Sequence, residues 1–229
     1  MGVTESEFAF LEDALPFWKH ISKEEQQEIL QAVILKTYHK GQKLHNGSED
    51  CAGLILVKSG QVRAFILSQS GKEITLYRLF ERDICIFSAS CIMKNINFDI
   101  YVEAQTDSQV LLIPTAIYNR LSQNSLAVAD FTNQLMSSRF SDVMWIMEQI
   151  LFMSFDERLA IFLLEQSAID GSDNLAITHE IIAKHMGSAR EVVTRMLKYF
   201  QEEGMVSLFR GGLNITDRRK LEKLAQREQ

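Results

Sequence analysis

The stretch LAITHEIIAKHMGSAREVVTRMLKYF, residues 175–200, decides the fold of the C-terminal part of the chain. It predicts a short helix that begins after Thr178, because a Thr hydroxyl is a good N-cap. That helix ends at Gly187, which tolerates the left-handed backbone of a helix C-terminus. Ser188 and Glu191 form the pattern Ser-x-x-Glu, which predicts that a second helix starts at Ser188. Two short helices joined by a glycine-containing turn are a helix-turn-helix.

Apolar residues give the second predicted helix one buried face. They recur at i, i+3, i+4 and i+7, the spacing of a single helix face. These residues are Val193, Met196, Leu197 and Phe200. The helix therefore packs on its own domain along this face and leaves its remaining side chains available for contacts.

The remaining side chains of the second helix can contact DNA, because the first turn of such a helix fits the major groove. Arg190 and Arg195 can each contact guanine or hold a phosphate, and Glu191 can accept from cytosine or orient an arginine. Lys198 is better suited to a phosphate. The simpler interpretation is a solvated helical pair with surface charges. The candidate DNA-contacting residues are Thr178, Ser188, Ala189, Arg190, Glu191, Arg195, Lys198 and Arg210.

A predicted β-hairpin follows the two helices and strengthens the DNA interpretation. Strands are predicted at 205–208 and 213–215, and the turn at 209–212 carries Arg210 at its tip as a phosphate contact. Asp217 then caps a final helix. A helix-turn-helix followed by such a hairpin is a winged helix.

Upstream, between Tyr38 and Ile113, short β-prone runs alternate with glycine turns. The runs are GLILV (53–57), VRAFIL (62–67), ITLYRL (74–79), IYVEA (100–104) and VLLI (110–113). Several short strands at close spacing predict an all-β roll, barrel or sandwich. A helical segment is predicted before them, from about residue 8 to residue 35. Within it, Ser22 and Glu25 form a capping box.

The chain returns to helix from Pro114 to Phe152. Apolar residues at steps of 4, 3, 4 and 3 form a seam of the kind found in coiled coils. The predicted seam consists of Met136, Phe140, Val143, Met147 and Ile150. The alternative is that this stripe packs on its own domain. Because a second apolar face is also present, the helix can pack on its own roll and on a second copy of the chain at once.

Composition and charge exclude several classes of protein. The 229-residue chain has a net charge of −6, which excludes a uniformly basic nucleic-acid binder but not a local basic face. We see neither an apolar run of roughly 18 residues nor a basic N-terminal segment of a signal peptide, so a cytoplasmic protein is expected. The three cysteines, without Cys-x-x-Cys spacing, predict neither a disulfide framework nor a zinc or Cys₄ iron–sulfur site.

These segments predict an α+β protein with three parts. Residues 1–120 form the β domain, a roll, barrel or sandwich that includes the N-terminal helical segment. Residues 121–153 form a dimerisation helix, and residues 154–229 form a winged helix-turn-helix domain. The break near Ser154 is the expected hinge between the domains.

Four motifs in order resemble the cyclic-AMP receptor / fumarate-nitrate reduction regulator (CRP/FNR) family over essentially the whole chain. They are YxKGxxL (38–44), LVxSGxVR (56–63), SGKEITL (70–76) and GSARExVxRxLK (187–198). The resemblance implies that residues 1–120 are a β-roll sensing domain, a double-stranded β-helix or jelly roll like that of cyclic-nucleotide-binding proteins. It implies a homodimeric transcription regulator. It also implies RNA polymerase as a partner and a palindromic DNA site, with recognition helices roughly 34 Å apart. It places Arg190, Glu191 and Arg195 at base-reading positions, whereas Ala189 stands where the family usually has Ser or Thr.

The effector pocket departs from the cyclic-nucleotide pattern of the family. Members that bind cyclic AMP carry Gly-Glu for the ribose and Arg-Ser or Arg-Thr for the phosphate. The matching pairs here are Ile86-Phe87 and Phe98-Asp99, so a phosphate would meet a carboxylate instead of a guanidinium. Cyclic AMP is therefore not expected. An iron–sulfur cluster is not expected either, because the N-terminal cysteine cluster of those members is missing.

The effector itself stays unknown. The candidate pocket residues are Cys85, Ile86, Phe87, Cys91, Phe98 and Asp99. They suit a small apolar or aromatic ligand, or a redox-sensitive thiol pair of Cys85 and Cys91, and the simpler interpretation is roll core. A haem would need His39 or His45, but a lone His near a turn is more often a surface residue.

Two other classes of function were weighed against a DNA-binding regulator. One is a roll that senses a signal and regulates a partner protein without binding DNA, which predicts no salt-dependent DNA affinity. The other is a jelly-roll enzyme, which would need converging metal ligands. His39 and His45 are the histidines of the β region, and no carboxylate–histidine cluster accompanies them. No catalytic or metal site is therefore predicted.

Overall fold

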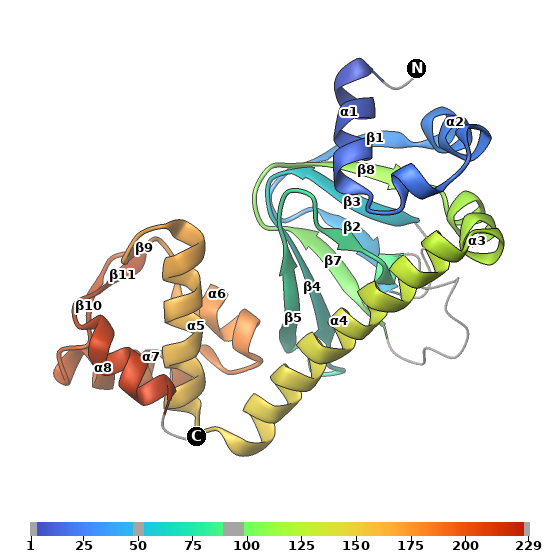
Figure 1. Ribbon diagram of the computed structural model, residues 1–229. Helices are drawn as coiled ribbons and strands as arrows, with labels where there is room; N and C mark the ends of the chain where they lie inside the picture. Colours follow the sequence, from blue (N-terminus) through green and yellow to red (C-terminus); the bar gives the residue numbers. More distant parts are fainter. Residues whose placement is uncertain (1–3, 48–52, 89–98, 227–229) are drawn as a thin grey trace. The chain divides into compact units, whose positions relative to one another are not determined.

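The computed structural model describes residues 4–47, 53–88 and 99–226. The chain forms two compact units, the first of residues 1–67 and 76–143 and the second of residues 68–75 and 144–229. Figure 1 shows a β-roll with helices in the first unit, and helices with a small sheet in the second. The expected α+β fold, a roll followed by a long helix and a winged helix-turn-helix, is confirmed.

The first unit begins with helices α1 (Glu5–Ala14), η1 (Trp18–His20) and α2 (Lys23–Ala32). The predicted capping box of Ser22 and Glu25 is present at the start of α2. The prediction of helix as far as residue 35 is wrong, because α2 ends at Ala32 and strand β1 (Ile34–Tyr38) follows. All five residues of β1 pair with strand β8, and this tertiary pairing overrides the helical pattern.

Two four-stranded sheets form the roll. The first has the order β1-β8-β3-β6, with β8 at Ser108–Ile113, β3 at Leu54–Ser59 and β6 at Ile84–Cys85. The second has the order β2-β7-β4-β5, with β2 at Lys43–Asn46, β7 at Tyr101–Ala104, β4 at Val62–Leu67 and β5 at Glu73–Leu79. The five predicted runs correspond to β3, β4, β5, β7 and β8, whereas β1, β2 and β6 were not predicted.

Strand β3 separates two hydrophobic cores, because successive side chains of a strand point to opposite faces. Leu54 and Leu56 pack into a core with the N-terminal helices, which cover this face of the sheet (Figure 1). Ile55 and Val57 pack into a second core, which lies between the two sheets. All four side chains are fully buried, which explains why β3 reads as a continuous apolar run.

Two helices follow the roll. Helix α3 (Thr115–Asn124) ends before Ser125, and α4 (Leu126–Phe152) then runs for 27 residues. The helix expected to start at residue 121 therefore starts at Leu126. Across the described residues, none of the helices combines the length and the apolar character that a membrane crossing requires.

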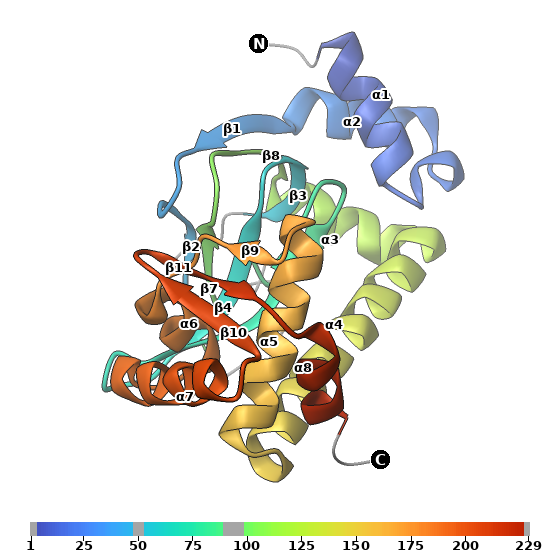
Figure 2. The ribbon, with the colours of Figure 1, turned by 90° about the vertical axis from the view of Figure 1, so that its left-hand side faces the viewer.

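The second unit contains the predicted winged helix-turn-helix. Figure 2 shows helices α5 (Phe155–Asp170), α6 (His179–Met186), α7 (Arg190–Glu202) and α8 (Arg218–Ala225) together with the small sheet. Side chains of these four helices share one hydrophobic core. The sheet has the order β10-β11-β9, with β10 at Val206–Phe209, β11 at Gly212–Ile215 and β9 at Asn174–Leu175. Ser154 caps α5, and its backbone amide donates to the Glu157 carboxylate at 2.8 Å.

Candidate nucleic-acid interface

Helix α6 (His179–Met186) begins and ends as the sequence predicts. The Thr178 hydroxyl accepts from the Ile181 amide at 3.3 Å, so it caps the helix. Gly187 has φ of +64°, the left-handed conformation that glycine adopts without strain. The amides of Gly187 and Ser188 both donate to the Ala183 carbonyl, which closes the turn that leads to the next helix.

The N-cap of helix α7 (Arg190–Glu202) lies one residue later than predicted. Its N-cap is Ala189, whose side chain makes no capping hydrogen bond, so the predicted Ser188–Glu191 capping box is wrong. The Ser188 amide is used to close α6, which leaves Ala189 in the extended conformation of an N-cap. The first turn of α7 therefore keeps amides that no side chain caps, and these can bind an anion such as a phosphate.

The apolar face predicted for α7 is confirmed, and the candidate contacts lie away from it. Val193, Leu197 and Phe200 are fully buried, and Met196 packs against the same core. Ser188 is half-buried. The other candidates are all exposed, namely Thr178, Ala189, Arg190, Glu191, Arg195, Lys198 and Arg210. Tyr199 is also exposed on α7. Tyr199 was not predicted from the sequence, although its spacing of four residues from Arg195 places it on the same surface of the helix.

A hydrogen-bonded link joins α6 to the first turns of α7. The Thr194 hydroxyl donates to the Arg190 carbonyl at 2.8 Å and lies 2.9 Å from Nδ1 of His179. Because the hydroxyl proton is already used, His179 is the donor in the second contact. Partial burial, together with the charge of Arg190, lowers the pKa of His179. The neutral imidazole thus holds the start of α7 in place.

The predicted wing is a hairpin of β10 (Val206–Phe209) and β11 (Gly212–Ile215). Phe209 pairs with Gly212, so Arg210 and Gly211 form a two-residue turn that places the Arg210 side chain at the tip. A Cβ atom at Gly212 would lie 2.3 Å from the Leu175 carbonyl oxygen of β9. Glycine is therefore needed for the close approach of these two strands.

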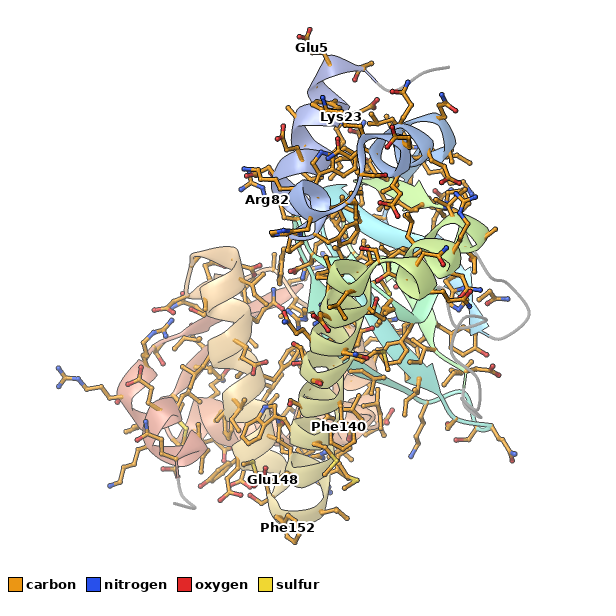
Figure 3. The ribbon with its side chains drawn as sticks, turned by 45° about the vertical axis from the view of Figure 1, so that its right-hand side comes forward. Glu5, Lys23, Arg82, Phe140, Glu148 and Phe152 are labelled. Carbon is orange, nitrogen blue, oxygen red and sulfur yellow. The ribbon has the colours of Figure 1, made fainter. Side chains whose placement is uncertain are left out.

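Helix α4 carries the predicted seam, and its residues divide into two groups. Met136 and Val143 are half-buried against cores of the first unit. Phe140, Met147 and Ile150 are exposed, and the side chain of Phe140 is 66% accessible (Figure 3). The two half-buried residues are therefore already partnered within their own chain. The assignment of the seam to an interface between two copies stays a prediction.

The predicted effector residues that the structure describes do not gather at one place. Cys85 and Phe87 are buried between the two sheets, whereas Ile86 is buried in the core below the N-terminal helices. Asp99 is exposed. Cys91 and Phe98 lie outside the described residues. The three buried side chains are part of the roll core.

The Cys85 thiol has a polar surrounding inside the core. Its Sγ lies 3.9 Å from the Tyr77 hydroxyl, and burial raises the pKa of both groups. The thiol is therefore held protonated, which disfavours a reactive role. Of the two histidines considered for a haem, His39 is exposed beside Asp107, whereas His45 is buried on β2, against the expectation of a surface residue.

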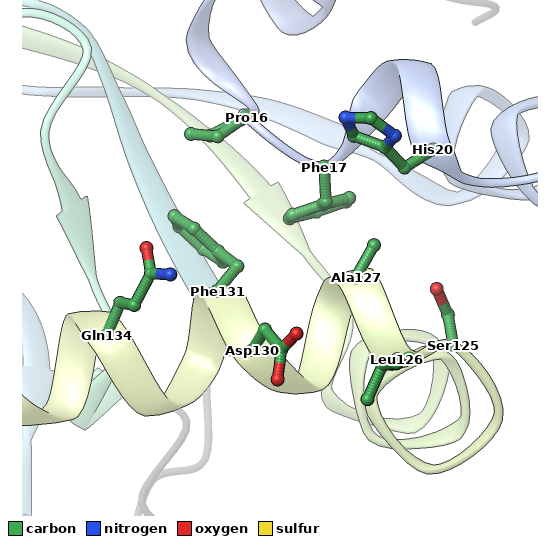
Figure 4. Close-up of a pocket in the computed structure, with 9 residues that line it drawn as sticks. All are labelled: Pro16, Phe17, His20, Ser125, Leu126, Ala127, Asp130, Phe131 and Gln134. Atoms are coloured by element: carbon green, nitrogen blue, oxygen red, sulfur yellow. The ribbon is translucent and has the colours of Figure 1, made fainter.

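A surface groove of about 540 Å³ lies elsewhere in the first unit (Figure 4). It runs between the segment after α1 and the first turns of α4. Pro16, Phe17 and His20 line one side, and Leu126, Asp130 and Phe131 are among the residues on the other. Among the described residues, no predicted effector residue lines this groove.

Comparisons with known proteins agree with these features. Residues 35–125 match the cyclic nucleotide-binding domain, and residues 157–224 match the Crp-like helix-turn-helix domain. The chain is 26% identical over 181 residues to the regulatory protein HlyX of Actinobacillus pleuropneumoniae, covering 76% of this chain and 74% of that protein. It is 25% identical over 210 residues to the cyclic AMP receptor protein of Thermus thermophilus, covering 92% and 96%.

A solved structure is more similar still. It is that of a transcriptional regulator assigned to the CRP/FNR family from Eubacterium rectale, with a TM-score of 0.91 and 50% sequence identity. The match covers 94% of this chain and 100% of that chain. The roll, the exposed α7 and the wing, together with a match of this extent, show that the chain is a transcription regulator of the CRP/FNR family with a helix-turn-helix DNA-binding domain.

Proposed function

We propose that the chain is a homodimer that reads a palindromic DNA site through α7. One observation carries this proposal: Arg190, Glu191 and Arg195 are exposed on α7, away from its buried face. Arginine and glutamate at such positions can read base edges, and Arg190 and Arg195 suit guanine. Lys198 and Arg210 are exposed cations suited to phosphates on either side of the groove.

Dimerisation is proposed to use the exposed apolar residues of α4. Phe140, Met144, Met147 and Leu151 are exposed at steps of 4, 3 and 4, which is coiled-coil spacing. A row of exposed apolar side chains on one helix indicates an interaction site. This row shares Phe140 and Met147 with the predicted seam, whose Ile150 is also exposed, and it leaves out Met136 and Val143, which pack on their own roll. A second copy of α4 would bury it.

The roll is proposed to control DNA binding in the cytoplasm, with RNA polymerase as a further partner expected from the family. A signal that binds the roll can act only through different affinities for two arrangements of the dimer. The departures at Ile86-Phe87 and Asp99 argue against cyclic AMP as that signal. A small ligand that is apolar or aromatic remains the proposed class.

The decisive experiment selects the fragments of the source genome that the full-length protein binds. A palindromic motif with half-sites about one helical turn apart supports the proposal. Recovery of fragments without a shared motif, or no salt-dependent affinity, would instead favour a roll that regulates a partner protein.

A further inference from the structure

Arg139 of α4 carries a charge that is almost buried against the roll. Its side chain is only 12% exposed. One guanidinium nitrogen donates to Asp142 at 2.9 Å and the other to the Ile84 carbonyl of β6 at 3.3 Å. The guanidinium carbon lies 4.4 Å from the centre of the Tyr77 ring on β5. Among the described residues, Nε has no hydrogen-bond partner. One side chain therefore connects α4 to two strands of the roll.

This arrangement is an inefficient source of stability. Arginine stays charged in proteins, and a buried charge must be compensated by well-placed partners. Here one donor stays unpaired, and the carboxylate that balances the charge is itself partly exposed. An apolar side chain of similar length at such a site is often as stable or more stable. What the arginine adds is geometry, because its contacts with the Tyr77 ring and the Ile84 carbonyl are in place only at one position of α4 against β5 and β6. Asp142 lies on α4 itself and balances the charge at any position of the helix.

The position of Arg139 along α4 gives this geometry a role. Helix α4 runs without interruption from the first unit, which ends at Val143, into the second, which continues from Met144. Arg139 thus contacts the roll about one helical turn before α4 enters the unit that carries α7. A shift of α4 along its axis, or a rotation about it, would break the contacts with Tyr77 and Ile84.

We propose that Arg139 is a positioning residue that locks the register of α4 against the roll and thereby sets the DNA affinity of α7. The proposal rests on the proposed function, because α7 must bind DNA for the lock to have this effect. The guanidinium of Arg139 makes its contacts with Tyr77 and the Ile84 carbonyl together, so a movement of α4 would break both contacts at once. Arg139 donates to strand β6 (Ile84–Cys85), which contains Cys85, the first of the candidate effector residues.

The test compares Arg139→Met with the wild-type full-length protein. The midpoint of urea unfolding is measured for both proteins. At a temperature where both are fully folded, the affinity for the genomically selected site and the hydrogen exchange of peptides covering 84–88 and 144–152 are then measured. For Arg139→Met we expect a urea midpoint that is unchanged or higher than that of the wild type. Its DNA affinity should differ from that of the wild type by about fivefold or more. Hydrogen exchange should be faster in both peptides. Because all variants are folded, a loss of stability alone does not change the affinity.

Two variants serve as controls. Arg120→Met removes an exposed arginine that pairs with Glu28 between α3 and α2, and Tyr77→Phe removes the hydroxyl but keeps the ring under Arg139. Both should bind DNA as the wild type does. An Arg139→Met protein with DNA affinity within about twofold of these controls would overturn the proposal. If the wild type binds no DNA, the proposed function fails independently of Arg139. In that case, hydrogen exchange of peptide 144–152 that is the same in Arg139→Met and in the wild type would overturn the positioning role of Arg139.

Discussion

The exposed side chains of α7 divide into those that can read bases and those that can hold phosphates. Arg195→Ala should weaken binding to the selected site by about 1–3 kcal/mol and leave binding to random DNA nearly unchanged, because a bidentate contact to guanine is lost. Lys198→Ala should weaken binding to both DNAs alike, since a phosphate contact carries no sequence information. Titrations of the two DNAs at one salt concentration measure this. Equal losses for Arg195→Ala would remove it from base reading.

His179 makes the stability of the unit that contains α7 depend on pH. Its pKa is lowered in the folded protein, by partial burial first and then by the charge of Arg190. The unfolded chain therefore binds the proton more tightly, so stability is complete above the ordinary pKa of about 6.5 and is lost as the pH falls below it. Urea midpoints at pH 7.5 and 5.5 should show this loss. His179→Gln, which cannot titrate, should show a smaller loss; an identical one would exclude His179 as the cause.

Single residues mark the limits of what the sequence could predict. The buried face of α7 follows from spacing alone, so Val193, Leu197 and Phe200 were predicted correctly. The N-cap of α7 was placed at Ser188 because Ser188-x-x-Glu191 matches a capping box. In the structure the Ser188 amide donates to the Ala183 carbonyl and closes α6 instead. Arg139 was missed because a charged residue on a long helix reads as solvated. Its burial depends on β5 and β6, which are far away in sequence.

At the scale of elements, α4 offers a direct test of dimerisation. Phe140→Glu should give monomers, because it places a charge in the exposed apolar row that a second copy would bury. Since Phe140 is largely exposed in the single chain, the fold itself should be unaffected. Sedimentation or light scattering measures the mass. Ser138→Glu, at another exposed position of α4, is the matched control and should remain dimeric. A dimeric Phe140→Glu protein would place the interface elsewhere.

Val143 shows why the seam could not be assigned from spacing. A step of 3 or 4 residues identifies an apolar stripe but not the partner that covers it. In the structure Val143 packs on the roll, whereas Phe140 does not. Strand β1 illustrates the same limit, because Ile34–Tyr38 becomes a strand by pairing with β8, more than seventy residues later in the chain.

At the scale of the whole molecule, the chain is acidic and yet is proposed to bind a polyanion. Its affinity should therefore depend on a few local cations such as Lys198 and Arg210, and the logarithm of affinity should fall linearly with the logarithm of salt concentration. Replacing Arg210 by Ala should make this slope shallower by about one. Fluorescence anisotropy at several salt concentrations gives the slope. An unchanged slope would show that Arg210 does not contact a phosphate.

The whole-chain architecture was the most predictable level. Four motifs in order, from YxKGxxL (38–44) to the α7 motif, sufficed for the family and the fold, because three of them span a glycine-containing turn between strands and the fourth spans the turn into α7. The division into 1–120, 121–153 and 154–229 stays a prediction. The effector could not be predicted, because its candidate residues Cys85, Ile86 and Phe87 also satisfy the requirements of an ordinary core.

The unbroken course of α4 makes the protein sensitive to insertions and deletions in an unusual, periodic way. One alanine added after Val143 turns everything downstream by about 100° about the helix axis, whereas seven added residues restore the phase to within about 20°. The first variant should lose binding to the palindromic site and the second should recover part of it, as measured by anisotropy. Related chains are then expected to differ along α4 by substitutions or by insertions of whole heptads. Insertions of other lengths would leave the segments before and after them folded but rotated relative to each other about the helix axis.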